Sequence, residues 1–127
     1  MEDEALFKEI LNAAFAVHSA LGPGLLESAY ARCLAVELAE CGISAEAEVV
    51  LPINYRSRKI ESAFRVDLLV EKRIVVELKS VVELTPLHLA QVLTYLKLLN
   101  LPSGLLINFN TVRLKDGIRR IFNNFSK

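Results

Sequence analysis

The sequence lacks the features that mark several classes of protein. Its 127 residues contain no tryptophan, only two cysteines, five glycines and four prolines. No apolar run approaches the roughly 20 residues of a membrane span, so we expect no membrane partner. No internal repeat or Gly/Ser/Pro-rich linker divides the chain, and 53% of its residues are hydrophobic. We therefore expect a single globular domain over residues 1–127.

The cysteines and the N-terminus both bear on the cellular compartment of the protein. Cys33 and Cys41 lie eight positions apart in one predicted helix, about 12 Å of rise, which is too far for a disulfide. The three residues after the initial methionine are all acidic, whereas a secretory signal begins with basic residues and continues with apolar ones. The cytoplasm is the expected location.

The chain carries no excess of either charge. Fifteen basic and 15 acidic residues give a net charge of zero, so the chain as a whole exerts no attraction on nucleic acid. Two local basic clusters are present: Arg56, Arg58 and Lys59, and then Arg113, Lys115, Arg119 and Arg120. Solvated charges on turns and edges are the favoured interpretation of both clusters, and a local basic surface is the alternative.

The apolar periodicity predicts an α/β (α+β) domain. Helical spacing of apolar residues covers residues 4–20, 25–41 and 85–100, where Thr85 is a natural N-cap and Pro86 suits the first helical position. Strand patterns cover residues 49–55, 60–70, 74–79 and 105–109, and Pro52 implies an edge position or an irregularity. After Asp116-Gly117 comes a final strand or helical turn. The order ααβββαβ predicts a mixed sheet of four to five strands flanked by helices.

The alternation of apolar and polar residues sets the register of the second and third strands. Their even positions are apolar, and buried faces must coincide across a strand pair. These positions are Phe64, Val66, Leu68, Val70, Ile74, Val76 and Leu78. A three-residue turn at 71–73 then pairs Val70 with Ile74, Leu68 with Val76, and Asp67 with Glu77.

Two carboxylates opposite each other repel, and a divalent cation would compensate them. Hard cations such as Mg²⁺ bind carboxylate and carbonyl oxygens, and Leu78 could add its backbone carbonyl between the two side chains. Lys79 shares the face of Glu77 and could orient a water molecule or stabilise phosphorane charge. The alternative is a solvated strand face on which Glu77 and Lys79 form an ordinary surface pair.

Polar residues on the helices point to the same groove. Glu27 stands in the first turn of the second helix, where the helix dipole favours an anion, and it borders the buried stripe. His88, Gln91 and Tyr95 follow one another at spacings of three and four on the third helix. A lone histidine there is more often a structural residue, but a row of three polar groups suggests a functional groove.

These residues resemble a known family. The segment Gly24-Leu25-Leu26-Glu27-Ser28-Ala29-Tyr30 is similar to the signature of the GxxExxY proteins, a branch of the PD-(D/E)XK nuclease superfamily. The resemblance runs in order through almost the whole chain from about Phe15. It includes Phe64-Arg65-Val66-Asp67-Leu68-Leu69-Val70, Val75-Val76-Glu77-Leu78-Lys79-Ser80, Ala90-Gln91-Val92-Leu93-Thr94-Tyr95, Gly104-Leu105-Leu106-Ile107-Asn108-Phe109 and Leu114-Lys115-Asp116-Gly117.

The resemblance implies a restriction-endonuclease-like core and a role for each matched residue. It implies that Asp67 and Glu77, with the Leu78 carbonyl, bind one or two Mg²⁺ or Mn²⁺ ions, and that Glu27 is an outer or second-metal ligand. It also makes Lys79 the catalytic lysine. Gln91 would join the catalytic set, and the predicted substrate contacts are Tyr30, His88 and Tyr95.

The function that the resemblance implies is a metal-dependent nuclease that hydrolyses phosphodiester bonds in nucleic acid, with DNA as the expected substrate. Many relatives act as dimers, so we expect a homodimer. The alternative is a catalytically silent nuclease-fold module that binds nucleic acid or a protein partner. A structural homo-oligomer without a ligand would leave the opposition of Asp67 and Glu77 unexplained.

Overall fold

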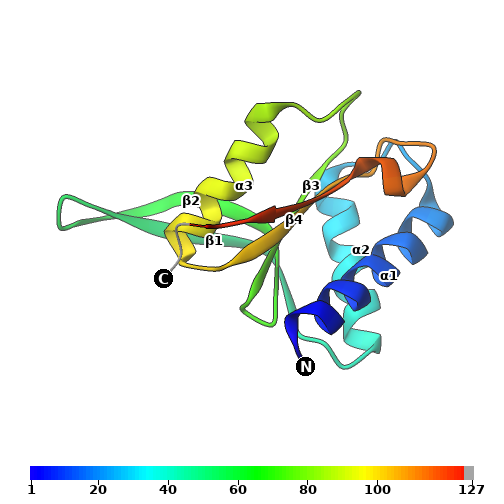
Figure 1. Ribbon diagram of the computed structural model, residues 1–127, viewed down its shortest axis with the longest axis horizontal. Coiled ribbons are helices and arrows are strands. Elements are labelled where there is room, and N and C mark those ends of the chain that lie inside the picture. The colour runs from blue at the N-terminus through cyan, green and yellow to red at the C-terminus, as the bar shows by residue number, and fades with distance from the viewer. Residues whose placement is uncertain (125–127) are drawn as a thin grey trace.

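A computed structural model describes residues 1–124 of the chain (Figure 1). Residues 125–127 of the predicted domain lie outside the described part. Within it, no helix is both long enough and apolar enough to cross a membrane. The elements are α1 (Asp3–Leu21), α2 (Glu27–Glu40), β1 (Ala45–Tyr55), β2 (Arg58–Val70), β3 (Ile74–Lys79), α3 (Pro86–Leu99), β4 (Ser103–Asn108), the 3₁₀ helix η1 (Leu114–Gly117) and β5 (Ile118–Phe122).

The five strands form one mixed sheet in the order β1-β2-β3-β4-β5. Strands β3 and β4 are parallel because α3 crosses over between them, and the other neighbours are antiparallel. The predicted α+β fold with a mixed, helix-flanked sheet is confirmed. The segment after Asp116-Gly117 was predicted as a strand or a helical turn, and the structure has η1 followed by β5.

Helices cover both faces of the sheet (Figure 1). Helices α1 and α2 pack on one face, over the buried residues of β3 that include Ile74, Val76 and Leu78. Helix α3 packs on the other face, where Val92 and Leu96 meet Val75 of β3. Strand β3 is therefore buried on both sides, and any polar side chain along it must find a partner within the protein.

The prediction that the even-numbered residues of β2 all face the same side of the sheet was wrong. Leu68 packs with α1 and α2 as expected, but Val66 and Phe64 belong to the core under α3. The reason is a kink at Glu48, whose positive φ of 55° rotates β1 between Ala45–Ala47 and Val49. Strand β2 turns over with its partner, because the two remain paired on both sides of the kink.

A tyrosine fixes the connection between α1 and α2. Helix α1 ends before Gly22, which has a φ of 70°. The Tyr30 hydroxyl donates a hydrogen bond to the Gly22 carbonyl at 2.5 Å and accepts one from the Leu25 amide at 3.1 Å. The Tyr30 ring stacks on Phe109 with centroids 4.2 Å apart. This connection determines where α2 begins, and therefore where Glu27 stands.

We predict that Tyr30→Phe lowers the free energy of unfolding by about 1–2 kcal/mol, because the Gly22 carbonyl and the Leu25 amide both lose a partner. Urea denaturation would measure the change. Tyr55→Phe is the matched control: Tyr55 is 64% exposed, and its variant should lie within about 0.5 kcal/mol of the wild type. Equal stability of the Tyr30→Phe variant and the wild type would contradict this role.

Candidate metal and catalytic site

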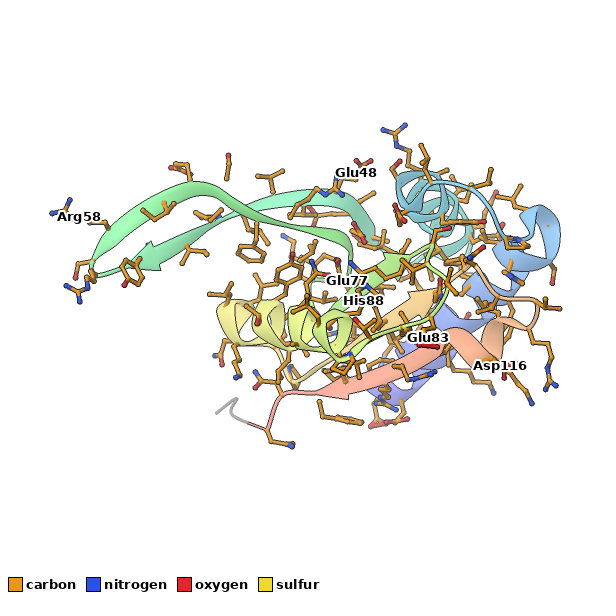
Figure 2. All side chains as sticks on the ribbon, turned by 90° about the horizontal axis from the view of Figure 1, so that it is seen from above. Glu48, Arg58, Glu77, Glu83, His88 and Asp116 are labelled. Atoms are coloured by element: carbon orange, nitrogen blue, oxygen red, sulfur yellow. The ribbon has the colours of Figure 1, made fainter. Side chains whose placement is uncertain are left out.

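A polar cavity opens where β2 and β3 separate, between the start of α2 and the first turns of α3. Its volume is about 440 Å³. Figure 2 labels Glu77 and His88 in this region, close to the N-terminal end of α3. The lining residues are Glu27, Arg65, Asp67, Glu77, Leu78, Lys79, Val81, His88, Gln91 and Tyr95.

Two interlocked carboxylates form the floor of the cavity. The predicted pairs Val70–Ile74 and Leu68–Val76 are present, and the β2–β3 ladder ends there. Beyond it, the Asp67 amide donates to Glu77 Oε2 at 2.7 Å, and the Leu78 amide donates to Asp67 Oδ2 at 2.9 Å. Each side chain thus replaces a backbone acceptor of the opposite strand. This exchange holds both carboxylates at fixed positions in the sheet.

Burial gives the pair an unusual protonation equilibrium. Asp67 is 7% exposed and Glu77 is 3% exposed. Burial and then the charge of Asp67 raise the pKa of Glu77 to about 8, while the hydrogen bond from the Asp67 amide and the charge of Lys79 oppose this rise. With no cation beside it, the pair therefore holds a proton at neutral pH.

The oxygens around the pair fit a hard divalent cation. One oxygen of each carboxylate accepts a backbone amide. The second oxygen of Asp67 meets Arg65 at 3.4 Å, a long contact that a bound cation could replace. Leu78 lines the same cavity, and its backbone carbonyl is an oxygen of the kind that Mg²⁺ accepts. Within residues 1–124, no three His, Cys, Asp or Glu side chains converge on one point. Glu27 therefore lines the cavity as a separate carboxylate.

A lysine and a glutamine face the carboxylates from the side. Lys79 Nζ donates to Gln91 Oε1 at 2.7 Å, so helix α3 holds the end of a side chain that β3 supplies. Thr85 and His88 form a reciprocal capping box at the start of α3, which fixes the helix that carries Gln91. His88 Nδ1 accepts the Thr85 amide at 3.0 Å while the side chain borders the cavity.

Tyr95 closes the cavity toward β2. Its ring lies 5.0 Å from the ring of Phe64. Burial raises the pKa of the Tyr95 hydroxyl, and the charge of Glu77 adds to this rise. A hydrogen bond with Gln91 acts in the opposite direction. Tyr95 is therefore a neutral hydrogen-bonding group at the edge of the site.

Arg65 is a cavity residue that the sequence reasoning did not select. Its guanidinium lies 3.4 Å from Asp67 Oδ1 and 3.4 Å from Glu48 Oε2. Glu48 in turn meets Arg32 of α2 at 3.2 Å. Arg65 stands two positions before Asp67 on a strand, and the period of two would have placed it on the same side.

The structure brings together all but one of the predicted site residues. Tyr30 is fully buried, and its hydroxyl is engaged by Gly22 and Leu25. It does not line the cavity, so we exclude it from the residues that could reach a substrate. Its connection to the site is indirect, through the position of Glu27.

We predict that Glu77→Gln removes a loss of stability that the wild type shows as the pH rises from about 4.5 to about 8. From pH about 4.5 to about 8 the native wild type keeps a proton that the unfolded chain has lost. Its free energy of unfolding should therefore fall as the pH rises, by at most about 1.4 kcal/mol per pH unit. The glutamine has no charge to bury.

Urea denaturation of both proteins across this pH range, with EDTA present to remove metal ions, would measure the difference. The stability of Glu77→Gln relative to the wild type should grow with pH. The comparison cancels the other titrating groups, which the two proteins share. Parallel pH profiles would contradict a proton held by the buried pair.

Comparisons with known proteins identify the family of the chain and a structure of similar fold. Residues 4–121 match the PD-(D/E)XK nuclease superfamily. A search of curated proteins finds no match. The solved structure described as "Crystal structure of SSO0001" is 25% identical, with a TM-score of 0.54; the similarity covers 94% of this chain and 59% of that one. The narrower GxxExxY assignment stays a prediction. The match over residues 4–121 shows that this chain belongs to the PD-(D/E)XK nuclease superfamily.

Proposed function

We propose that the chain is a divalent-metal-dependent nuclease that hydrolyses phosphodiester bonds in nucleic acid, with DNA as its substrate. The observation that carries the proposal is the interlocked pair of buried carboxylates, Asp67 and Glu77, beside a lysine in an open cavity. Membership of the nuclease superfamily supports the reaction class. The choice of DNA rests on the family resemblance.

In this proposal Asp67, Glu77 and the Leu78 carbonyl would hold Mg²⁺ or Mn²⁺, and Glu27 would serve an outer position or a second ion. A bound ion supplies a Lewis acid that polarises a phosphate oxygen and lowers the pKa of the attacking water. The residues of the chain supply the remaining parts of the reaction, which are positioning and hydrogen bonding.

Lys79 is placed to act on the reacting groups. Gln91 occupies one N–H of its ammonium and leaves two others, which can donate to the attacking water or to a non-bridging phosphate oxygen. Donors held at a fixed position stabilise charge that develops in the transition state. Gln91 is therefore a positioning residue for Lys79.

Arg65 is placed to receive the substrate. Its contacts with Asp67 and Glu48 are long, at 3.4 Å each, and its side chain is 51% exposed. A guanidinium at the rim of the cavity can exchange such contacts for a bidentate contact with phosphate. His88 and Tyr95 line the cavity as further hydrogen-bonding groups for substrate.

The remaining parts of the proposal are a homodimer and a cytoplasmic location. Strand β1 is an edge of the sheet, and its unpaired backbone groups offer one possible contact between two copies. Sedimentation of the purified chain would establish its association state.

We predict that Asp67→Asn and Lys79→Met each lower the rate of DNA cleavage in Mg²⁺ or Mn²⁺ by about 100-fold or more, because each removes a group that acts in the transition state. Gel assays with mixed DNA and RNA substrates would measure the rates, and circular dichroism would confirm folding. Arg113→Ala, an exposed change outside the cavity, should cleave like the wild type.

Equal cleavage by all four proteins would assign the activity to a contaminant and contradict the proposal. Nucleic-acid binding without cleavage in the wild type would instead support the catalytically silent module.

A further inference from the structure

The paired strands β1 and β2 continue beyond the sheet as a projecting arm. This arm is the hairpin tip from Asn54 to Ser62. Figure 2 shows it reaching away from the helices, with Arg58 at its far end. Every residue of the arm is exposed. Because no helix covers it, its side chains do not contribute to the folded core and are free to meet a partner.

The turn at the end of the arm has a defined backbone conformation. Arg56 and Ser57 have φ values of 50° and 63°, and the flanking residues Tyr55 and Arg58 are paired. Two successive residues with positive φ are typical of the two-residue type I′ turn, whose twist matches that of the strands. The arm therefore presents its tip at a defined place.

The root of the arm is anchored beside the cavity. Phe64, just below the arm, contacts the ring of Tyr95, and Leu51 on the other strand packs in the core under α3. Three residues further along β2 lies Asp67. The same strand therefore carries the metal-binding carboxylate at one end and the exposed tip at the other.

The tip has an excess of positive charge. Lys59 pairs with Glu61 at 3.6 Å. Arg56 and Arg58 form no ion pair with any residue in the described part of the chain, and both are exposed. In a chain of zero net charge, this is a local site for a polyanion.

The arm and the cavity lie within reach of one stretch of duplex. Asp67 follows Arg58 by nine positions along β2, which is at most about 30 Å at ~3.3 Å per residue. A duplex advances by ~3.4 Å per base pair, so the two lie at most about nine base pairs apart. We propose that Arg56 and Arg58 bind backbone phosphates of a double-stranded nucleic acid within about nine base pairs of the bond held in the cavity, an inference that rests on the proposed nuclease function.

Substitution of the two arginines tests the proposal. Arg56→Asn/Arg58→Thr removes both charges with residues that suit the positions, since asparagine tolerates positive φ and threonine suits a strand. The probe is a fluorescent 30-base-pair DNA duplex in EDTA, which prevents cleavage, and anisotropy is measured at several salt concentrations. Arg113→Ala/Lys115→Ala is the control with the same loss of charge, in and beside η1 near Asp116, far from the arm in Figure 2.

The slope of log K against log[salt] should become shallower by about 1.8 in the arm variant, because each lost phosphate contact accounts for about 0.9. Between 50 and 200 mM salt the wild type should then lose about tenfold more affinity than the variant. The control should keep the slope of the wild type. Arg56→Lys/Arg58→Lys retains both charges and should keep it too.

Three results would overturn the proposal: no duplex binding by the wild type, an unchanged slope in the arm variant, or an equal loss of slope in the control. If the arm variant sediments as a monomer, the wild type as a dimer, and both bind DNA alike, the arm is a contact between copies instead. Failure of the nuclease proposal is separate, because it appears as absent cleavage in Mg²⁺ while duplex binding in EDTA persists.

Discussion

The site depends on the exchange of hydrogen bonds between two carboxylates and the backbone of the opposite strand. Where the β2–β3 ladder ends, Glu77 accepts the Asp67 amide and Asp67 accepts the Leu78 amide. These bonds allow the strands to separate without leaving buried donors unpaired, and the separation creates the cavity. They also hold two acidic groups together at a cost, which appears as the raised pKa of Glu77. A cation bound between the two carboxylates would relieve that cost.

Much of the fold could be predicted from local patterns. Thr85-Pro86 starts α3 because capping depends only on adjacent residues, and the short turn at 71–73 sets the β2–β3 register for the same reason. The predicted alternation of buried and exposed residues along β2 does not continue past Asp67. The cause is a kink at Glu48, which lies on the neighbouring strand β1 and could not be recognised from the sequence of β2. Strand β1 begins at Ala45, earlier than expected, since alanine gives a weak strand signal.

The spacing of residues in the sequence predicted which side chains gather at the site, but not how they contact one another. Parity placed Asp67 near Glu77, and the family resemblance supplied Glu27 and Gln91; the structure has all four around one cavity. Spacing does not show which oxygen accepts which amide, so the interlock could not be foreseen. The Tyr30 expectation shows the same limit: its position in the sequence motif reflects the connection before α2 rather than a contact with substrate.

The most direct test of the account is a crystal structure of the protein soaked in millimolar Mn²⁺, with anomalous diffraction collected near the manganese edge. We expect an anomalous peak at roughly 2.1 Å from one oxygen of Asp67 and one of Glu77, with the Leu78 carbonyl as a further ligand. The hydrogen bonds from the Asp67 and Leu78 amides should remain in place. No peak at this site, or a peak only elsewhere on the molecule, would contradict the account.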